Sequence, residues 1–290
     1  MSLPRVFVLG AGRAGRGLAA ALRNALVEVT ALHGRRPEPD AEHPVTAGDV
    51  SPYLANADVA LIAVRDSQLD AAVEELLAAH PPSGLVMLHA SGGVEPAAYR
   101  EARRGGHPCG TFHPLLPLAD PGEAARLFRG AWVGIDGDPA ARGASKALAK
   151  ALGARTLDIP ANRALYHVGA VLASNFLGVL ASVAARAMGE AGVEEESAVS
   201  ASRSLLLAAA DNLRVRQAAE VITGPIARGD EATVKAHLEA VAPHSDLDRV
   251  YRTLSRQALA LARERGVPDE KLANIARLLG DASSDDPQAP

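Results

Sequence analysis

The sequence predicts an α/β protein in which a parallel-sheet domain is followed by an all-α domain. Through the first 160 residues, short apolar runs alternate with stretches of helical period. This alternation is typical of βαβ units and a parallel sheet. After Pro160 only helical stretches follow, so we place the domains at residues 1–160 and 161–290. A chain of 290 residues is long enough for two domains.

The same periodicity predicts the individual elements. The expected strands are Val6–Leu9, Val27–Leu32, Val59–Val64, Leu85–His89, Trp132–Ile135 and Thr156–Ile159. The helices expected between them are Ala14–Leu26, Gln68–Ala79 and Ala140–Leu152. The helices expected in the second domain are Asn162–Ala191, Glu194–Asn212, Asp230–Ala240, Ser245–Arg265 and Asp269–Leu279, with Gly and Pro between them.

Composition narrows the class of partner. The chain has 30 Lys and Arg against 34 Asp and Glu, a net charge of −4, which does not favour nucleic acid as a partner. Four Phe, four Tyr and one Trp offer a poor surface for stacking bases. The single cysteine, Cys109, excludes an intramolecular disulfide and a cysteine-based zinc cluster, and we expect no bound metal.

The apolar segments favour a cytoplasmic protein that does not enter a membrane. The run after Met1–Arg5 is too short for the core of a signal peptide. Val168–Ala185 is nearly long enough to span a bilayer, but Asn175 lies inside it and Gly and Ala are abundant. We interpret this segment as a helix buried on all sides.

A glycine-rich turn follows the first expected strand. Its sequence is Gly10-Ala11-Gly12-Arg13-Ala14-Gly15, a G-x-G-x-x-G that opens a helix within a βαβ unit. In this motif the first glycine permits the tight turn, the second lets the backbone approach a pyrophosphate, and the third allows close helix–strand packing. The motif predicts a Rossmann-type domain that binds a dinucleotide. The alternative is a turn that needs glycines for structural reasons alone.

The second expected strand indicates which dinucleotide binds. It ends in His33-Gly34-Arg35-Arg36, without the Asp or Glu that usually binds the ribose 2′-hydroxyl of NAD. Paired guanidinium groups suit a 2′-phosphate, so we expect NADP(H). The alternative is that Arg35 and Arg36 are ordinary solvated loop residues.

Polar residues follow three further apolar runs, where ligands bind in open α/β sheets. Val64 precedes Arg65-Asp66-Ser67, where a cofactor contact is expected, although Asp66 or Ser67 also suits a helix N-cap. His89 and Ser91 precede two glycines in a loop that we expect beside the nicotinamide, unless Ser91 only caps a turn. His113 is held extended by Pro114 and is a candidate proton donor, or else a structural histidine.

These motifs together resemble a known family. Besides those above, the sequence contains Phe112-His113-Pro114-Leu115, Tyr166-His167, Ala173-Ser174-Asn175 and Thr223-Gly224-Pro225-Ile226-Ala227-Arg228-Gly229-Asp230. In this order they resemble Rossmann-like proteins with the domain of unknown function DUF2520. These are predicted NADP-dependent oxidoreductases, similar to pyrroline-5-carboxylate reductase and the 6-phosphogluconate dehydrogenase superfamily.

The resemblance implies a homodimer formed through the helical domain and an active site in the interdomain cleft. On the long helix expected from Asn162, we expect His167, Ser174 and Asn175 to share one face. Related dehydrogenases carry a lysine where this chain has Val171, which makes His167 a possible replacement acid. Asn175 is a candidate for orienting a substrate oxygen. Alternatively, Asn175 is a buried structural amide and His167 packs at the domain junction.

The function predicted from these features is NADP(H)-dependent reduction of a small carbonyl or imine. Its candidate catalytic residues are His113, His167, Asn175 and Ser91. Its candidate cofactor-binding residues are Gly10, Ala11, Gly12, Arg13, Ala14, Gly15, Gly34, Arg35, Arg36, Val64 and His89. The alternative is a dinucleotide-binding sensor or scaffold without catalysis, which the absence of a lysine at Val171 favours.

Overall fold

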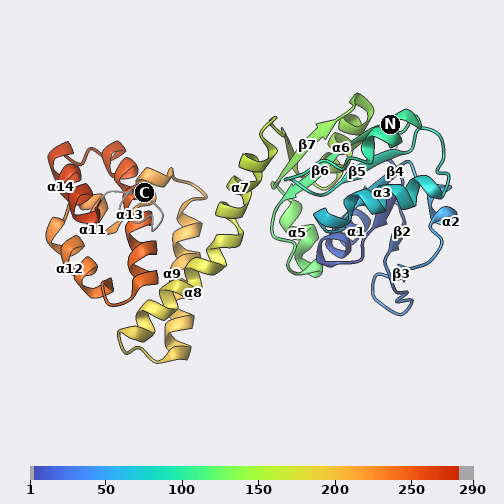
Figure 1. Cartoon of the computed structure of the whole chain (residues 1–290). Coiled ribbons are helices and arrows are strands. Elements are labelled where there is room, and N and C mark those ends of the chain that lie inside the picture. The colour runs from blue at the N-terminus through green and yellow to red at the C-terminus, as the bar shows by residue number, and fades with distance from the viewer. Residues whose placement is uncertain (1–2, 281–290) are drawn as a thin grey trace, which may run out of the picture. The chain divides into compact units, whose positions relative to one another are not determined.

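The computed structural model describes residues 3–280. These form two compact units that divide between Phe176 and Leu177, and we describe each unit by itself (Figure 1). The predicted domain boundary at Pro160 marks the end of the strand–helix alternation. The first unit extends past it because the next helix, α7 (Arg163–Ala173), packs against the sheet.

The first unit contains a mixed, largely parallel sheet of eight strands. Their order is β3-β2-β1-β4-β5-β6-β7-β8. From β3 to β6 all neighbours are parallel, which is the doubly wound order of dinucleotide-binding folds. The bounds are β1 Val6–Leu9, β2 Val29–His33, β3 Val45–Thr46, β4 Val59–Ile62, β5 Val86–His89, β6 Cys109–Leu115, β7 Trp132–Gly137 and β8 Arg155–Asp158.

Strands β3 and β6 were not among the elements that the periodicity predicts. β6 contains Gly110 and Pro114, two residues that weaken a strand pattern. Pro114 is tolerated because β5 pairs with β6 only as far as Thr111, so this residue lies beyond that ladder. β7 then pairs with β6 from Gly110 to Leu115 in the antiparallel sense, and β8 is parallel to β7.

Helices cover both faces of the sheet (Figure 1). On one face, α1 (Arg13–Asn24), α5 (Ala124–Phe128) and α6 (Pro139–Ala151) enclose a buried core that includes Leu18, Leu22, Phe112 and Leu148. On the other face, α2 (Ser51–Leu54), α3 (Leu69–Ala78) and α4 (Tyr99–Arg104) pack over Phe7, Ile62 and Met87. The inner strands are buried on both faces, as parallel sheets require.

The second unit is entirely helical in its described residues. Its core gathers Ile226, Val234, Leu238, Ala262 and Ile275 from the last four helices. Its helices are α8 Asn175–Glu190, which begins just before the division, α9 Glu195–Asn212, α10 Ala218–Val221, α11 Gly224–Arg228, α12 Glu231–Val241, α13 Ser245–Glu264 and α14 Asp269–Leu279.

The long helix expected over Asn162–Ala191 is in fact two helices, α7 and α8. Ser174 leaves the helical conformation at φ −123° and ψ −69°, and the two axes meet at 41°. Ser174 and Asn175 both have a lower helix propensity than the Ala and Leu residues around them, which lowers the cost of a break at this point. The prediction that His167 and Asn175 share one face of a continuous helix is therefore wrong.

The prediction that this segment is buried on all sides is also wrong. Neither α7 nor α8 contains a fully buried residue, and Leu172 and Val179 are 59% and 54% exposed, because nothing in the described chain covers them. No single described helix is long and apolar enough to cross a membrane. The bent pair α7 and α8 does pass that test of length and composition when taken together.

Candidate functional site

The glycine turn joins β1 to α1 with the geometry that a bound pyrophosphate requires. Gly10 has φ +116°, and a Cβ there would lie 2.5 Å from the Ala63 carbonyl oxygen. A Cβ on Gly15 would overlap the Gly10 carbonyl. A Cβ on Gly12 would meet nothing within 4 Å, and no side chain caps the N-terminus of α1 at this residue. Gly10 and Gly15 are thus fixed by packing, whereas Gly12 faces open space.

A cavity of about 710 Å³ opens beside this turn. Its volume is typical of small-molecule sites, which measure roughly 300–1,000 Å³. The predicted cofactor-binding residues that line it are Gly10, Ala11, Gly12, Gly34, Arg35, Arg36 and Val64, whereas Arg13, Ala14, Gly15 and His89 do not. Sequence reasoning missed further lining residues, among them Arg16, His33, Glu38, Gln68 and Glu75.

Four arginines line this cavity, and three of them have no side-chain partner among the described residues. Arg35, Arg36 and Arg65 are exposed and their side chains make no hydrogen bond or ion pair with another described residue. Arg16 instead donates to the Ala11 carbonyl at 2.9 Å and pairs with Glu38 at 2.7 Å. Arg35, Arg36 and Arg65 are therefore the cations available to an anionic ligand.

A second cluster forms where the loop after β5 meets β6 and α7. The rings of His113 and His167 have their centroids 5.8 Å apart, and His113 Nδ1 lies 2.9 Å from the Tyr166 hydroxyl. A Cβ on Gly92 would lie 2.5 Å from the His113 ring, so the loop can pass here only as glycine. The structure thus brings together three of the candidate catalytic residues, Ser91, His113 and His167, and adds Tyr166.

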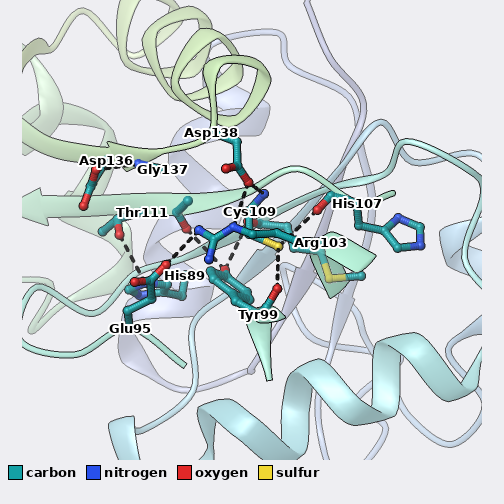
Figure 2. A network of polar contacts seen from close by, with 12 residues as sticks. His89, Glu95, Tyr99, Arg103, His107, Cys109, Thr111, Asp136, Gly137 and Asp138 are labelled. Carbon is teal, nitrogen blue, oxygen red and sulfur yellow. Dashed lines mark hydrogen bonds and ion pairs between the residues drawn. The ribbon is translucent and has the colours of Figure 1, made fainter. Parts of the chain in front are cut away.

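Arg163 anchors α7 to the sheet beside this cluster. Its Nη2 donates to Asp136 on β7 at 2.7 Å and to Thr111 on β6 at 3.0 Å, with the Arg163 side chain only 15% exposed. Nη1 of Arg163 is buried without a partner. The Thr111 hydroxyl also contacts His89 Nε2 at 3.1 Å (Figure 2). Sequence reasoning missed Arg163 because a single arginine after a helix N-cap carries no motif.

Burial changes the protonation of these groups. Loss of solvation lowers the pKa of His89 to about 3, and the nearby charge of Arg163 lowers it further. Burial lowers the pKa of His113 to about 4, with a smaller contribution from His167. Burial also raises the pKa of Tyr166 to about 12. At neutral pH, His89 and His113 are therefore uncharged and Tyr166 keeps its proton.

A network of ion pairs supports the strands beneath this cluster (Figure 2). Arg103 on α4 pairs with Glu95 at 2.8 Å and with Asp138 at 3.0 Å, and Asp138 accepts from the Cys109 amide at 2.8 Å. Buried Tyr99 donates to backbone carbonyls of β5 and β6. Burial raises the pKa of the Cys109 thiol to about 12, so this cysteine stays protonated and does not act as a nucleophile.

The remaining predicted site residues lie as follows. The Ser91 hydroxyl accepts from the Gly93 amide at 3.3 Å, which is the local turn contact considered as an alternative. His89 is fully buried. Asn175 is exposed at the start of α8 and has no hydrogen bond within the described residues. Residues 3–280 contain no group of three or more His, Cys, Asp or Glu placed to hold a metal ion.

The strand order and the glycine turn together define a Rossmann-type protein. Within that class, residues 131–258 match the family model of DUF2520, a domain of unknown function, which confirms the resemblance for this part of the chain. The match begins within the first unit and includes β7, β8 and α7, and with them Arg163, Tyr166 and His167. No curated protein matches the sequence.

Several solved structures share the fold. A protein from Thermotoga maritima is 19% identical, with 90% of this chain and 100% of that chain covered and a TM-score of 0.70. A candidate NADP oxidoreductase from Bacteroides fragilis is 22% identical, with coverages of 89% and 98% and a TM-score of 0.65. Plasmodium falciparum pyrroline carboxylate reductase with NADP bound is 11% identical, with coverages of 97% and 100% and a TM-score of 0.57.

The lowered histidine pKa values predict that stability depends on pH. In the unfolded chain these histidines bind a proton below about pH 6.5, whereas folded His89 and His113 bind one only near pH 3 and 4. The free energy of unfolding should therefore fall as the pH is lowered from 6.5 to 5, with a slope that approaches about 1.4 kcal/mol per pH unit for each of these histidines toward pH 5. Urea denaturation at several pH values between 6.5 and 5 measures this pH dependence of the free energy of unfolding. Most carboxylates are already ionised in this range and contribute little to it.

Two variants show which histidine causes this pH dependence of the free energy of unfolding. His113→Gln should reduce the slope by the contribution of one histidine. His80→Asn, at an exposed left-handed position that Asn tolerates, should leave it unchanged. A free energy of unfolding that stays flat between pH 6.5 and 5 in the wild type would show that neither buried histidine is neutral in the folded protein.

Proposed function

We propose that this protein is an NADP(H)-dependent oxidoreductase that reduces a small carbonyl or imine compound. The observation that carries the proposal is the Gly10–Gly15 turn, in which two glycines are fixed by packing and Gly12 alone borders open space. That arrangement fits a pyrophosphate at the N-terminus of α1, where the helix dipole and free amides favour an anion. The NADP-bound reductase structure with the same fold supports this choice.

Two arginines at the cavity suit the phosphate of NADP(H). Arg35 and Arg36 lie just after β2 and lack side-chain partners among the described residues. No carboxylate stands at the end of β2 where an NAD site would place one, and Glu38, the first acid after β2, is paired with Arg16. Two guanidinium groups can bind a 2′-phosphate through charge-assisted hydrogen bonds. When bound, the cofactor supplies a hydride. The chain's own residues bind and orient the substrate and move a proton.

Nucleotide binding tests the cofactor assignment. Wild type should bind NADPH more tightly than NADH in a fluorescence or calorimetric titration. Gly12→Val should remove binding of both while the protein stays folded, because the new side chain enters only the space assigned to the pyrophosphate. The double variant Arg35→Ala/Arg36→Ala should weaken NADPH binding about 10- to 100-fold, the effect of losing charged hydrogen bonds, with little change for NADH.

Arg104→Ala, on exposed helix α4 and outside the cavity, is the matched control and should bind as the wild type does. Circular dichroism and thermal melting should show that Gly12→Val is folded. If wild type binds neither nucleotide, or if folded Gly12→Val binds NADPH normally, the glycine turn has only a structural role and the proposed oxidoreductase function is wrong.

The cluster around His113 supports a reductase rather than a binding protein. It places a neutral histidine beside a second histidine and a tyrosine, next to a glycine loop that packs closely against the ring. Such groups can hold a substrate oxygen or nitrogen and deliver a proton to it. Val171, where related dehydrogenases carry a lysine, is the one feature that favours a non-catalytic sensor.

Measurement of turnover distinguishes a reductase from a non-catalytic sensor. NADPH consumption should appear with at least one member of a panel of 2-keto acids, semialdehydes and cyclic imines. His113→Gln should lower the turnover of that compound about 100-fold or more, in line with the loss of a general acid, while NADPH affinity stays unchanged. Tight NADPH binding with no turnover across the panel would favour the sensor, and an unchanged rate in His113→Gln would remove this residue from the mechanism.

We also infer that the protein is a homodimer formed through the helical region. Helix α8 carries Gly178, Ala181, Ala185 and Gly189 along a groove of about 790 Å³ that it shares with α9. Around it, Phe176, Val179, Leu205 and Leu207 are each at least 46% exposed. Small residues permit close helix contact, and an apolar surface of this kind is typical of an interface. A second copy of the same chain is the occupant that the family resemblance implies.

Light scattering coupled to gel filtration in detergent-free buffer should therefore give twice the mass of one chain. Val179→Asp places a charge on the proposed interface and should shift the protein toward the monomer. Leu26→Asp, at an even more exposed apolar position in the first unit, should not. A monomeric wild type at micromolar concentration would overturn the inference.

A further inference from the structure

His113 and Tyr166 form a closely fitted pair. Their rings meet edge to face with centroids 5.6 Å apart, and the Tyr166 hydroxyl lies 2.9 Å from His113 Nδ1. Glycines make room for both partners. A Cβ on Gly92 would lie 2.5 Å from the His113 ring, and a Cβ on Gly134 would overlap the Tyr166 hydroxyl. A larger residue at Gly92 or Gly134 would occupy the space that His113 and Tyr166 fill.

The backbone around the pair is held in place independently of the bond between them. Arg163 lies one helical turn before Tyr166, and its contacts with Asp136 and Thr111 fix the start of α7 against β6 and β7. His113 lies on β6, which pairs with β7 from Gly110 to Leu115. Because both side chains come from anchored elements, the hydrogen bond is not needed to bring them together.

The direction of this hydrogen bond follows from the chemistry of its partners. A neutral imidazole nitrogen is a better acceptor than a phenol oxygen, and a phenol is the better donor. His113 is uncharged at neutral pH, because burial lowers its pKa to about 4, and Tyr166 is protonated. Tyr166 therefore donates to Nδ1, and the imidazole carries its own proton on Nε2.

The Nε2 atom is the free end of the pair. It has no hydrogen-bond partner among the described residues. Unlike Nδ1 of His89 and of His167, which are buried without a partner, Nε2 of His113 is not fully buried. His113 retains 9% of its exposure, so its Nε2–H group can reach a bound molecule.

We propose that Tyr166 is the positioning residue for His113: it fixes the Nε2–H tautomer and supplies the proton that His113 passes to the carbonyl oxygen of a neutral aldehyde or ketone. This proposal rests on the proposed function, which supplies a reduced nicotinamide as hydride donor. The hydride adds to the carbonyl carbon, and the C=O π electrons move to oxygen. That oxygen takes the Nε2 proton, Nδ1 takes the Tyr166 proton, and the phenolate regains a proton from solvent.

The charges around His113 favour a neutral carbonyl over a cationic iminium. The groups that act on it are His167 and Arg163 from α7, and Asp66 from the loop after β4. Arg163 is a permanent cation whose charge is largely balanced by its ion pair with Asp136, and Asp66 is exposed to solvent. None of these groups is a buried, unpaired carboxylate, so none of them would stabilise a cationic iminium. Oxygen that gains negative charge during reduction would instead be stabilised by the Nε2–H donor of His113.

Histidine-ring nitrogen NMR tests the tautomer without any substrate. In uniformly ¹⁵N-labelled wild type at pH 7, His113 should show a protonated Nε2 and a hydrogen-bonded, unprotonated Nδ1. In Tyr166→Phe the Nδ1 signal should move toward the position of a nitrogen without a donor. A His113 ring protonated on Nδ1, or on both nitrogens, in the wild type would overturn the proposal, as would an Nδ1 signal that Tyr166→Phe does not change.

The chain offers a matched control in its second unit. His237 Nδ1 lies 3.0 Å from the Tyr251 hydroxyl, with the rings again edge to face at 5.7 Å. Tyr251→Phe removes the same kind of bond at an exposed histidine and should leave the His113 signals unchanged. A change of the His113 signals in Tyr251→Phe equal to that in Tyr166→Phe would show that they report a general loss of structure.

Turnover tests the proton transfer. With the carbonyl compound that wild type reduces fastest, Tyr166→Phe should lower kcat at least 10-fold, with NADPH affinity and KM within about twofold of wild type. The wild-type kcat/KM should stay flat from pH 5.5 to 8, since His113 does not titrate there. A wild-type protein that does not bind NADPH would instead disprove the proposed function. Reduction of imines alone, or a kcat unchanged in Tyr166→Phe, would overturn this proposal.

Discussion

The contact on which the candidate site depends is the one between Arg163 and the sheet. One guanidinium reaches Asp136 on β7 and Thr111 on β6, the two strands that meet in the antiparallel sense. The Arg163 side chain is mostly buried, so breaking this pair would leave an uncompensated charge away from water. The strength of the contact fixes where α7 starts, and every residue that α7 brings to His113 depends on that position.

The reversal at β7 explains why this contact exists. In a fully parallel sheet, the strand after β6 would follow a crossover and end at the same edge as the others. Here β7 runs back along β6, so Asp136 near its end lies opposite Thr111 near the start of β6. β8 then leaves the sheet at Asp158, and only four residues separate it from α7. The short connection delivers Arg163, Tyr166 and His167 to the same side of β6.

Much of the fold could be predicted from the sequence because its signals are local. The glycine turn, the alternation of strands and helices and the change after Pro160 are each visible within a few residues. β6 escaped prediction because Gly110 and Pro114 disrupt its pattern, and only pairing with β5 and β7 makes it a strand. The bend at Ser174 escaped because one serine in a long apolar run is compatible with a continuous helix. The strand therefore depends on its tertiary pairing, whereas the bend is a local break that the apolar pattern does not reveal.

The candidate site shows the same difference between features that are local in the sequence and features that are not. The end at the glycine turn could be predicted from the sequence, because its features lie in consecutive backbone positions and in two adjacent arginines. The cluster around His113 could be predicted only in part, because it combines residues more than fifty positions apart. The Tyr166-His167 motif is visible in the sequence, but the sequence does not show that the Tyr166 hydroxyl contacts His113. Burial completes the chemistry. It leaves His113 neutral, so the ring can accept a proton at one nitrogen while it gives one up at the other. A charged imidazolium has no free acceptor nitrogen and can only donate. The same histidine at an exposed position would lose this two-sided behaviour as the pH falls through its ordinary pKa.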